Sequence, residues 1–150
     1  MAHTLHRVQW LPTSLEATFE FFSRPENLAR ITPPWLAFRM VSEDAAMREG
    51  HRIEYRIRPL GLPQKWVSEI TAYDPPHRFV DEQVAGPYAR WHHEHRFRAL
   101  NGGTEVTDTV SYALPFGPLG RLAHALFVRR QLESIFEFRR ARLSELLGDG

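Results

Sequence analysis

Hydrophobic and polar residues alternate along much of this chain, and a two-residue period of this kind predicts β-strands. One strand is expected near the start of the chain, and six more follow from its second quarter onward. They cover residues 3–11, 35–43, 51–60, 64–73, 77–85, 89–100 and 104–114. The separators between the later strands, such as Gly61-Leu62-Pro63 and Asn101-Gly102-Gly103, are too short to hold a crossover helix. These strands should therefore be joined as antiparallel hairpins.

Helical periods appear in three other segments. A short helix should begin behind a capping box made by Thr13 and Glu16, and a second short helix should end before Thr32-Pro33-Pro34. A third helix runs from Leu119 to Leu147 without a proline. Its apolar face changes direction part-way, counting about 100° per residue. This helix therefore kinks, or its first half faces a dimer partner or the mouth of a cavity instead of the sheet.

This order of elements predicts an α+β fold in a single domain of residues 1–150. A curved antiparallel sheet of seven strands would wrap around the long C-terminal helix. The two short helices, which lie between the first and second strands, would close one end of the sheet. This arrangement is the helix-grip architecture.

Composition and charge exclude several classes of function. The chain has no cysteine, which excludes disulfides, thiolate catalysis and cysteine-ligated metals. Its formal net charge is +1, and glutamates interleave with Arg129-Arg130 and Arg139-Arg140-Arg142. We therefore expect these arginines on a solvated helix flank and expect no nucleic-acid partner. No signal-peptide pattern opens the chain and no apolar run approaches 18 residues, so we expect a cytoplasmic protein without a membrane span.

The inward faces of the predicted strands carry polar as well as apolar side chains. Successive strand residues point to opposite faces, so the more hydrophobic face of each strand should point inward. The inward set contains Tyr55, Ile57, Trp66, Ser68, Trp91, His93, His95, Phe97, Asp108 and Tyr112. The two faces of strand 77–85 are similar, so Asp81 and Gln83 point inward in only one of two assignments. An unpaired buried polar group costs about 1–3 kcal/mol, so these groups need partners or water.

Four interpretations of His93, His95 and Asp108 are open at this point. In the first, the histidines are structural and pair with Asp108 and Asp81 beneath the helix. In the second, they form the polar part of a ligand-cavity wall. In the third, a His–Asp pair acts as a general acid and base, which makes His93, His95 and Asp108 candidate catalytic residues. In the fourth, two histidines and a carboxylate form a metal triad, but His-x-His alone is a weak signal, and we expect no metal and no cofactor.

Three motifs resemble a bacterial branch of the SRPBCC superfamily. They are Leu28-Ala29-Arg30-Ile31-Thr32-Pro33, Gly86-Pro87-Tyr88-x-x-Trp91-x-His93-x-His95-x-Phe97 and Gly103-Thr104-x-Val106-x-Asp108-x-Val110-x-Tyr112-x-Leu114-Pro115-Phe116-Gly117. The superfamily includes START lipid-binding domains, birch-pollen-allergen proteins and polyketide cyclases/dehydrases. The resemblance implies a helix-grip fold with a deep apolar cavity and a hydrophobic or amphipathic ligand, such as a lipid, polyketide or isoprenoid. It supplies no catalytic residues. Related domains also occur fused ahead of NAD-dependent epimerase domains.

We therefore expect a protein that binds a hydrophobic small molecule between the sheet and the long helix. The predicted cavity residues are the inward set above, with Leu122, Leu126 and Phe136 on the far wall. One alternative is an enzyme of the cyclase or dehydratase type that uses an inward His–Asp pair. A second alternative is a partner-binding module, or a homodimer, that uses residues 119–127 of the long helix.

Overall fold

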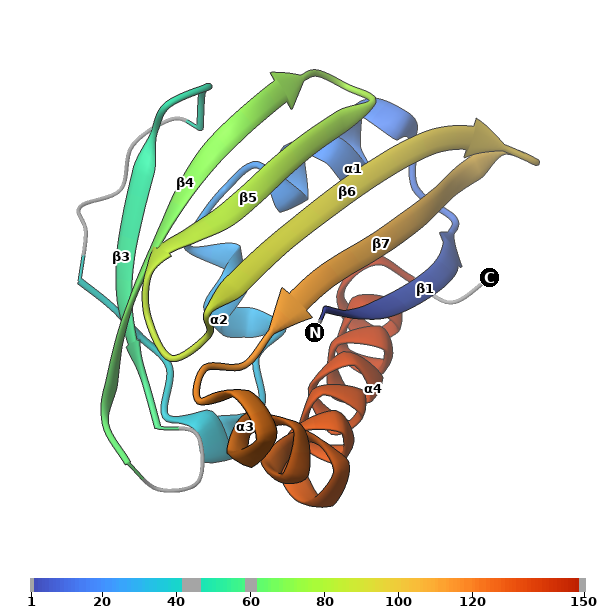
Figure 1. The fold of residues 1–150 in the computed structure, drawn as a ribbon. Coiled ribbons are helices and arrows are strands. Elements are labelled where there is room, and N and C mark those ends of the chain that lie inside the picture. Colours follow the sequence, from blue (N-terminus) through green and yellow to red (C-terminus); the bar gives the residue numbers. More distant parts are fainter. Residues whose placement is uncertain (1, 42–46, 59–61, 149–150) are drawn as a thin grey trace.

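The centre of the structure is an antiparallel sheet in which the first strand pairs with the last (Figure 1). The computed structural model describes residues 2–41, 47–58 and 62–148, and within these residues the sheet has seven strands in the order β1-β7-β6-β5-β4-β3-β2. The strands are β1 (His3–Leu11), β2 (Arg39–Met40), β3 (Arg52–Ile57), β4 (Gln64–Asp74), β5 (Arg78–Ala85), β6 (Arg90–Leu100) and β7 (Gly103–Ala113). All neighbouring pairs are antiparallel, which confirms the predicted hairpins.

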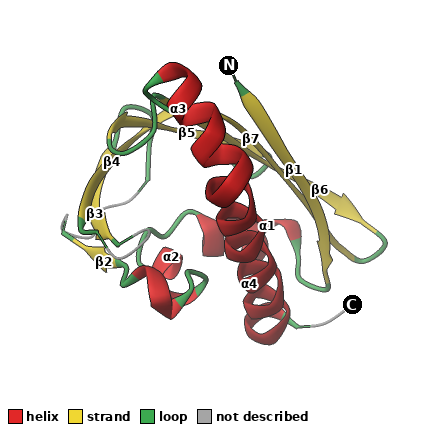
Figure 2. Cartoon of the chain, turned by 60° about the horizontal axis from the view of Figure 1, so that its bottom comes forward, coloured by secondary structure: helices red, strands yellow, loops and turns green. Residues whose placement is uncertain are grey.

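Helices cover the concave side of this sheet. After β1 come α1 (Leu15–Phe22), α2 (Asn27–Arg30) and the 3₁₀ turn η1 (Pro34–Leu36). After β7, α3 (Gly117–Ala123), the π-helical turn η3 (His124–Val128) and α4 (Arg129–Leu147) form one helical run. Figure 2 shows α4 running across the hollow of the curved sheet. The predicted α+β helix-grip fold is confirmed.

Two apolar clusters make up the core, one toward each end of the sheet. In the first, Phe19 of α1 packs edge-on against Phe79 and Phe97, with ring centroids 6.0 and 5.2 Å apart. In the second, Leu132 and Phe136 of α4 pack with Leu5, Val110 and Tyr112. Along β6, Trp91 packs against the second cluster and Phe97 belongs to the first. The two histidines between them therefore lie where the two apolar clusters separate.

The predicted strand at residues 35–43 is mostly wrong. The 3₁₀ turn η1 occupies its first part, and only Arg39 and Met40 pair with β3; residues 42 and 43 lie outside the described part of the chain. Pro34 is suited to the first position of a helical turn, because the missing amide proton has no helical acceptor there. Ala37 then adopts a left-handed conformation with φ of 51°, which ends the turn. Local turn chemistry therefore overrides the β-branched and aromatic composition.

The predicted capping box at Thr13 is also wrong. Ser14 is the N-cap of α1, and its hydroxyl oxygen accepts a 3.2 Å hydrogen bond from the amide of Ala17. The Thr13 hydroxyl instead donates to the carbonyl oxygen of Leu147 at 2.9 Å. Thr13 thus joins the start of α1 to the last turn of α4.

The π-helical turn η3 explains why the apolar face of the long helix changes direction. A π turn contains about one more residue than an α-helical turn, so it rotates the preceding residues relative to those that follow. Leu132 and Phe136 of α4 are buried, whereas Leu119 of α3 is 72% exposed. Its neighbour Leu122 is 56% exposed.

Among the described residues, no helix combines the length and apolarity required to cross a membrane.

A histidine, not a leucine, attaches the first half of the helical run to the sheet. Nε2 of the buried His124 lies 2.8 Å from the hydroxyl oxygen of Tyr112 on β7. The His124 ring stacks on His3 of β1, with 3.5 Å between ring centroids. These contacts fix η3 to two adjacent strands and leave the leucines of α3 exposed.

Gly120 allows α3 to approach the segment that follows β7. A Cβ atom at this position would collide with the carbonyl oxygen of Pro115 and press on the side chain of Leu114. We expect Gly120→Ala to lower the free energy of unfolding by about 1–3 kcal/mol, because the colliding atom is backbone and cannot rotate away. Leu119→Ala is the control on the same helix, with an expected change within about 0.5 kcal/mol. Urea unfolding of both variants measures the difference, and equal effects would contradict this interpretation.

Candidate functional site

An apolar cavity of about 370 Å³ lies between the concave face of the sheet and the helices. Its lining comes from α1, α2 and η1, from strands β3 to β6, and from η3 and α4. Eight of the residues predicted for the cavity wall are part of this lining. They are Tyr55, Ile57, Trp66, Ser68, Trp91, His93, His95 and Phe136.

The other five predicted residues lie elsewhere. Phe97, Asp108 and Tyr112 are buried but are not part of the lining. Leu122 and Leu126 were predicted on the far wall, but both are more than half exposed and neither contributes to the lining. The physical reason is the π turn η3, which contains Leu126 and directs Leu122 of the preceding α3 away from the sheet. The far wall is formed instead by α4 residues, including Leu132.

Aromatic side chains surround one part of the cavity. Trp66 of β4 donates its indole proton to the hydroxyl of Ser68 at 2.8 Å, which satisfies both buried groups. The Trp66 ring packs edge-on against Trp91 at 5.2 Å and parallel to Tyr55 at 5.9 Å. Burial raises the pKa of Tyr55, and the negative charge of Asp81 raises it further. Tyr55 therefore keeps its proton and offers a neutral hydroxyl.

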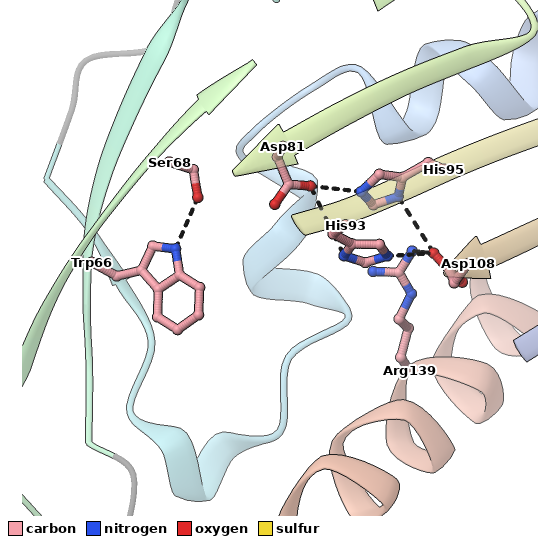
Figure 3. Close-up of polar contacts among 7 residues, drawn as sticks. All are labelled: Trp66, Ser68, Asp81, His93, His95, Asp108 and Arg139. Atoms are coloured by element: carbon pink, nitrogen blue, oxygen red, sulfur yellow. Dashed lines mark hydrogen bonds and ion pairs between the residues drawn. The ribbon is translucent and has the colours of Figure 1, made fainter. Parts of the chain in front are cut away.

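A group of polar contacts joins residues of β5, β6, β7 and α4 at one side of the cavity (Figure 3). His93 Nε2 lies 2.8 Å from Asp108 Oδ1, and His95 Nε2 lies 2.6 Å from Asp81 Oδ2. The two imidazole rings stack with 3.7 Å between centroids. Arg139 of α4 donates from Nη2 to Asp108 Oδ1 at 3.0 Å. We call these five residues the charge cluster.

The sheet register brings the charge cluster together. His93 and His95 are two residues apart on β6, so they share the concave face. Asp81 of β5 lies opposite His93, and Asp108 of β7 lies opposite His95. Each histidine nevertheless bonds to the diagonal carboxylate, a distance that a long side chain can span across strands.

Two members of the charge cluster were not identified with certainty from the sequence. Alternation could not place Asp81, because Phe79 and Val80 on β5 are both buried and each face therefore looks apolar. Arg139 was expected on a solvated flank with Arg140 and Arg142, but it is only 7% exposed. One signal for Arg139 was available, since residues 132, 136, 139 and 143 share one helical face and the other three are apolar.

Gln83, the other ambiguous residue of strand 77–85, has a structural contact. Its side-chain amide donates to the carbonyl oxygen of Tyr88 at 2.6 Å and accepts from the amide of Tyr88 at 3.0 Å. The side chain thus closes the turn between β5 and β6. It does not belong to the cavity lining.

The electrostatics favour one protonated imidazole in the charge cluster. Burial alone would raise the pKa of Asp108, but the Arg139 guanidinium and the two imidazoles hold it well below its usual value. Burial would lower the pKa of His95, yet its contacts with Asp108 and Asp81 raise it overall. Burial and the charge of His95 lower the pKa of His93. Two carboxylates, one guanidinium and one imidazolium then give no net charge.

This arrangement can bind a polar group, exchange a proton or hold a cation. The three residues predicted as catalytic, His93, His95 and Asp108, lie together, although Asp108 is behind the imidazoles. Within the described part of the chain, Asp81, His93 and His95 also have metal-ligand atoms within 4.8 Å of one another.

Comparison with known proteins identifies similar sequences and folds. A family model described as "Polyketide cyclase / dehydrase and lipid transport" matches residues 11–137. No curated protein matches the sequence. A solved structure from Chromobacterium violaceum is 14% identical, with a TM-score of 0.75 and coverage of 99% of both chains. The structure of Ara h 8.0201 is 16% identical, with a TM-score of 0.64 and coverage of 96% of this chain and 99% of that one.

A third similar structure is longer than this chain. It is the nucleoside-diphosphate sugar epimerase from Corynebacterium glutamicum, which is 25% identical and has a TM-score of 0.67. The match covers 94% of this chain but 28% of the epimerase. The similarity is therefore to one part of that enzyme.

Arg139 is expected to be the largest single contributor to the stability of the charge cluster. Arg139→Met would leave the carboxylate of Asp108 buried without its cation, at a cost of about 3–5 kcal/mol. Adding Asp108→Asn should recover part of this loss, because the uncompensated charge disappears with it. Denaturant unfolding of the two single variants and the double variant at pH 7 measures the coupling. Arg130→Met, at an exposed position of α4, is the control.

The loss caused by Arg139→Met should also depend on pH. The pKa of Asp108 is lowered in the folded protein, so its ionisation contributes stability above its ordinary value of 3.8. That contribution is lost as the pH falls toward the folded pKa. The stability difference between wild type and Arg139→Met should therefore shrink below about pH 4. A difference that stays constant from pH 7 to pH 3 would show that packing, not charge, determines the effect.

Proposed function

Because this chain belongs to the polyketide cyclase/dehydrase and lipid transport family, we propose that it binds a hydrophobic or amphipathic small molecule in the cavity between the sheet and α4. The ligand class is a lipid, polyketide, isoprenoid or similar metabolite with one polar end. The single observation that carries this proposal is the open, largely apolar cavity between the concave face of the sheet and the helices.

The size and lining of the cavity support the proposal. Its volume of about 370 Å³ lies within the range of roughly 300–1,000 Å³ that small-molecule sites occupy. Leu28, Ile53, Trp66 and Leu132 belong to the lining and offer apolar area for affinity. Side chains from α1, α2 and η1 on one side and from α4 on the other leave this space unfilled.

The position of the charge cluster supports a ligand with a polar end. Asp81, His93, His95 and Arg139 belong to the lining, on the opposite side from Trp66 and Ser68 (Figure 3). Arg139 Nε is buried without a hydrogen-bond partner, although Nη2 of the same side chain is bonded to Asp108. A few fixed polar groups in an apolar cavity orient a ligand. These protein groups lose their water when the ligand binds, and only a ligand group that hydrogen-bonds to them compensates for that loss.

A bound ligand should raise the melting temperature by linkage, because it binds the folded state alone. At a ligand concentration of 100 times Kd the gain is about 2.7 kcal/mol, which corresponds to roughly 5–10 °C for a domain of this size. Thermal-shift measurements with lipids, quinones and aromatic polyketides test this expectation. Absence of any shift across all three classes would count against the proposal.

A cavity-filling variant tests the location. Ile135 of α4 lines the cavity, so Ile135→Trp should weaken binding at least tenfold by occupying ligand space. Its neighbour Ser134 is exposed, so Ser134→Trp adds the same side chain outside the cavity and should leave the affinity unchanged. Titration of both variants with the strongest ligand gives the comparison. Equal weakening by the two substitutions would place the ligand elsewhere.

A further inference from the structure

We propose that Asp81, His93 and His95 form a binding site for one divalent first-row transition-metal ion, on the cavity side of the charge cluster. The three residues supply two imidazole nitrogens and one carboxylate oxygen. All three belong to the cavity lining, whereas Asp108 lies behind them. This donor set suits Zn²⁺, Fe²⁺, Co²⁺ or Mn²⁺ better than Mg²⁺ or Ca²⁺, which take oxygen ligands.

The three ligand atoms lie within 4.8 Å of one another. Asp81 Oδ2 lies 2.6 Å from His95 Nε2 and 3.9 Å from His93 Nδ1 (Figure 3). Ligands held 2.0–2.1 Å from a tetrahedral ion lie about 3.3 Å from one another. The observed separations fall on both sides of this value. The two imidazole rings are stacked, with 3.7 Å between centroids and 23° between planes, so at least one ring must turn out of the stack to direct its nitrogen at a shared ion.

Asp108 can accept the second ring proton of both proposed histidine ligands. A ligating histidine usually donates its other ring proton to a carboxylate or carbonyl, which fixes its orientation. His93 Nε2 and His95 Nδ1, the nitrogens directed away from Asp81, lie 2.8 and 3.4 Å from Asp108 Oδ1. Buried His95 Nδ1 has no hydrogen-bond partner. When an ion replaces the proton between His95 Nε2 and Asp81, Nδ1 can hold the remaining ring proton and donate it to Asp108.

Charge balance within the cluster is compatible with a divalent ion. An ion that binds here displaces the imidazolium proton, after which Asp81, Asp108 and Arg139 carry a net charge of minus one with both imidazoles neutral. A divalent cation changes this to plus one. A metal-bound hydroxide or an oxygen anion of a bound ligand would then restore neutrality, and only this role of the ligand rests on the proposed function.

The test is titration of metal-depleted protein. After dialysis against a chelator, Co²⁺ and Zn²⁺ are added near neutral pH, and binding is followed by calorimetry and by the visible absorption of Co²⁺. We expect saturation at one equivalent. Asp81→Asn and His93→Gln should each lower the affinity at least 100-fold. Asp108→Asn should lower it about 10–100-fold while the stoichiometry stays at one.

Two control variants separate this site from other histidines. His92→Gln changes the neighbouring residue of β6, which faces the opposite side of the sheet, and should leave the affinity unchanged. His3→Gln removes one ring of the stacked pair His3 and His124, and should also leave it unchanged. Circular dichroism of every variant checks the fold. X-ray absorption of the wild-type Zn²⁺ complex should show two imidazoles, a result that needs no variant.

Three outcomes would overturn the proposal. They are no saturable binding by the wild type, undiminished affinity in folded Asp81→Asn, or loss of binding in His3→Gln. Metal titration of Ile135→Trp keeps the two proposals distinct, because filling the apolar part of the cavity should not remove the ion. Ligand-induced thermal stabilisation without metal binding would overturn only the metal site.

Discussion

Two carboxylates on one face of a sheet, Asp108 buried and Asp81 with its side chain 20% exposed, are the constraint on which the rest of the structure depends. Asp81 and Asp108 cannot remain ionised there without compensating charge, because transfer of an unpaired charge from water is far more costly than any single packing contact can offset. The sheet supplies His93 and His95 between them, and α4 supplies Arg139. The position of α4 across the sheet is therefore fixed by an ion pair as well as by packing.

The charge cluster also shapes the interior. Its two histidines lie on β6 between Phe97, which belongs to the first apolar cluster, and Trp91, which packs against the second. Arg139 stacks over Phe22 and Phe136, with its guanidinium carbon 5.2 and 5.6 Å from the ring centroids. The guanidinium therefore contacts Phe22 of α1 in the first apolar cluster and Phe136 of α4 in the second, and Arg139 is also part of the cavity lining.

The fold could be predicted from the sequence because it depends on patterns that are local. Alternation in residues 64–73, 89–100 and 104–114, and the short turns between them, leave antiparallel pairing as the only solution. The candidate site was harder. His93, His95 and Asp108 stood out as polar residues on apolar faces. Asp81 lies on a strand whose two faces each carry an apolar residue, and Arg139 lies among arginines that were expected on a solvated flank. The outward rotation of Leu122 depends on a π turn, which no residue pattern in residues 124–128 indicates.

The pairing of β1 with β7 has a consequence for how the chain acquires its structure. Leu5 lies beside Val110 in the sheet, so β1 can pair with β7 only after about a hundred further residues have been synthesised. Closure of so large a loop is entropically costly, and contacts of this range slow folding. The hairpins from β3 to β7 can assemble first, because each joins neighbouring segments of sequence. The edge of β7 then stays unpaired until β1, which was synthesised much earlier, joins the sheet.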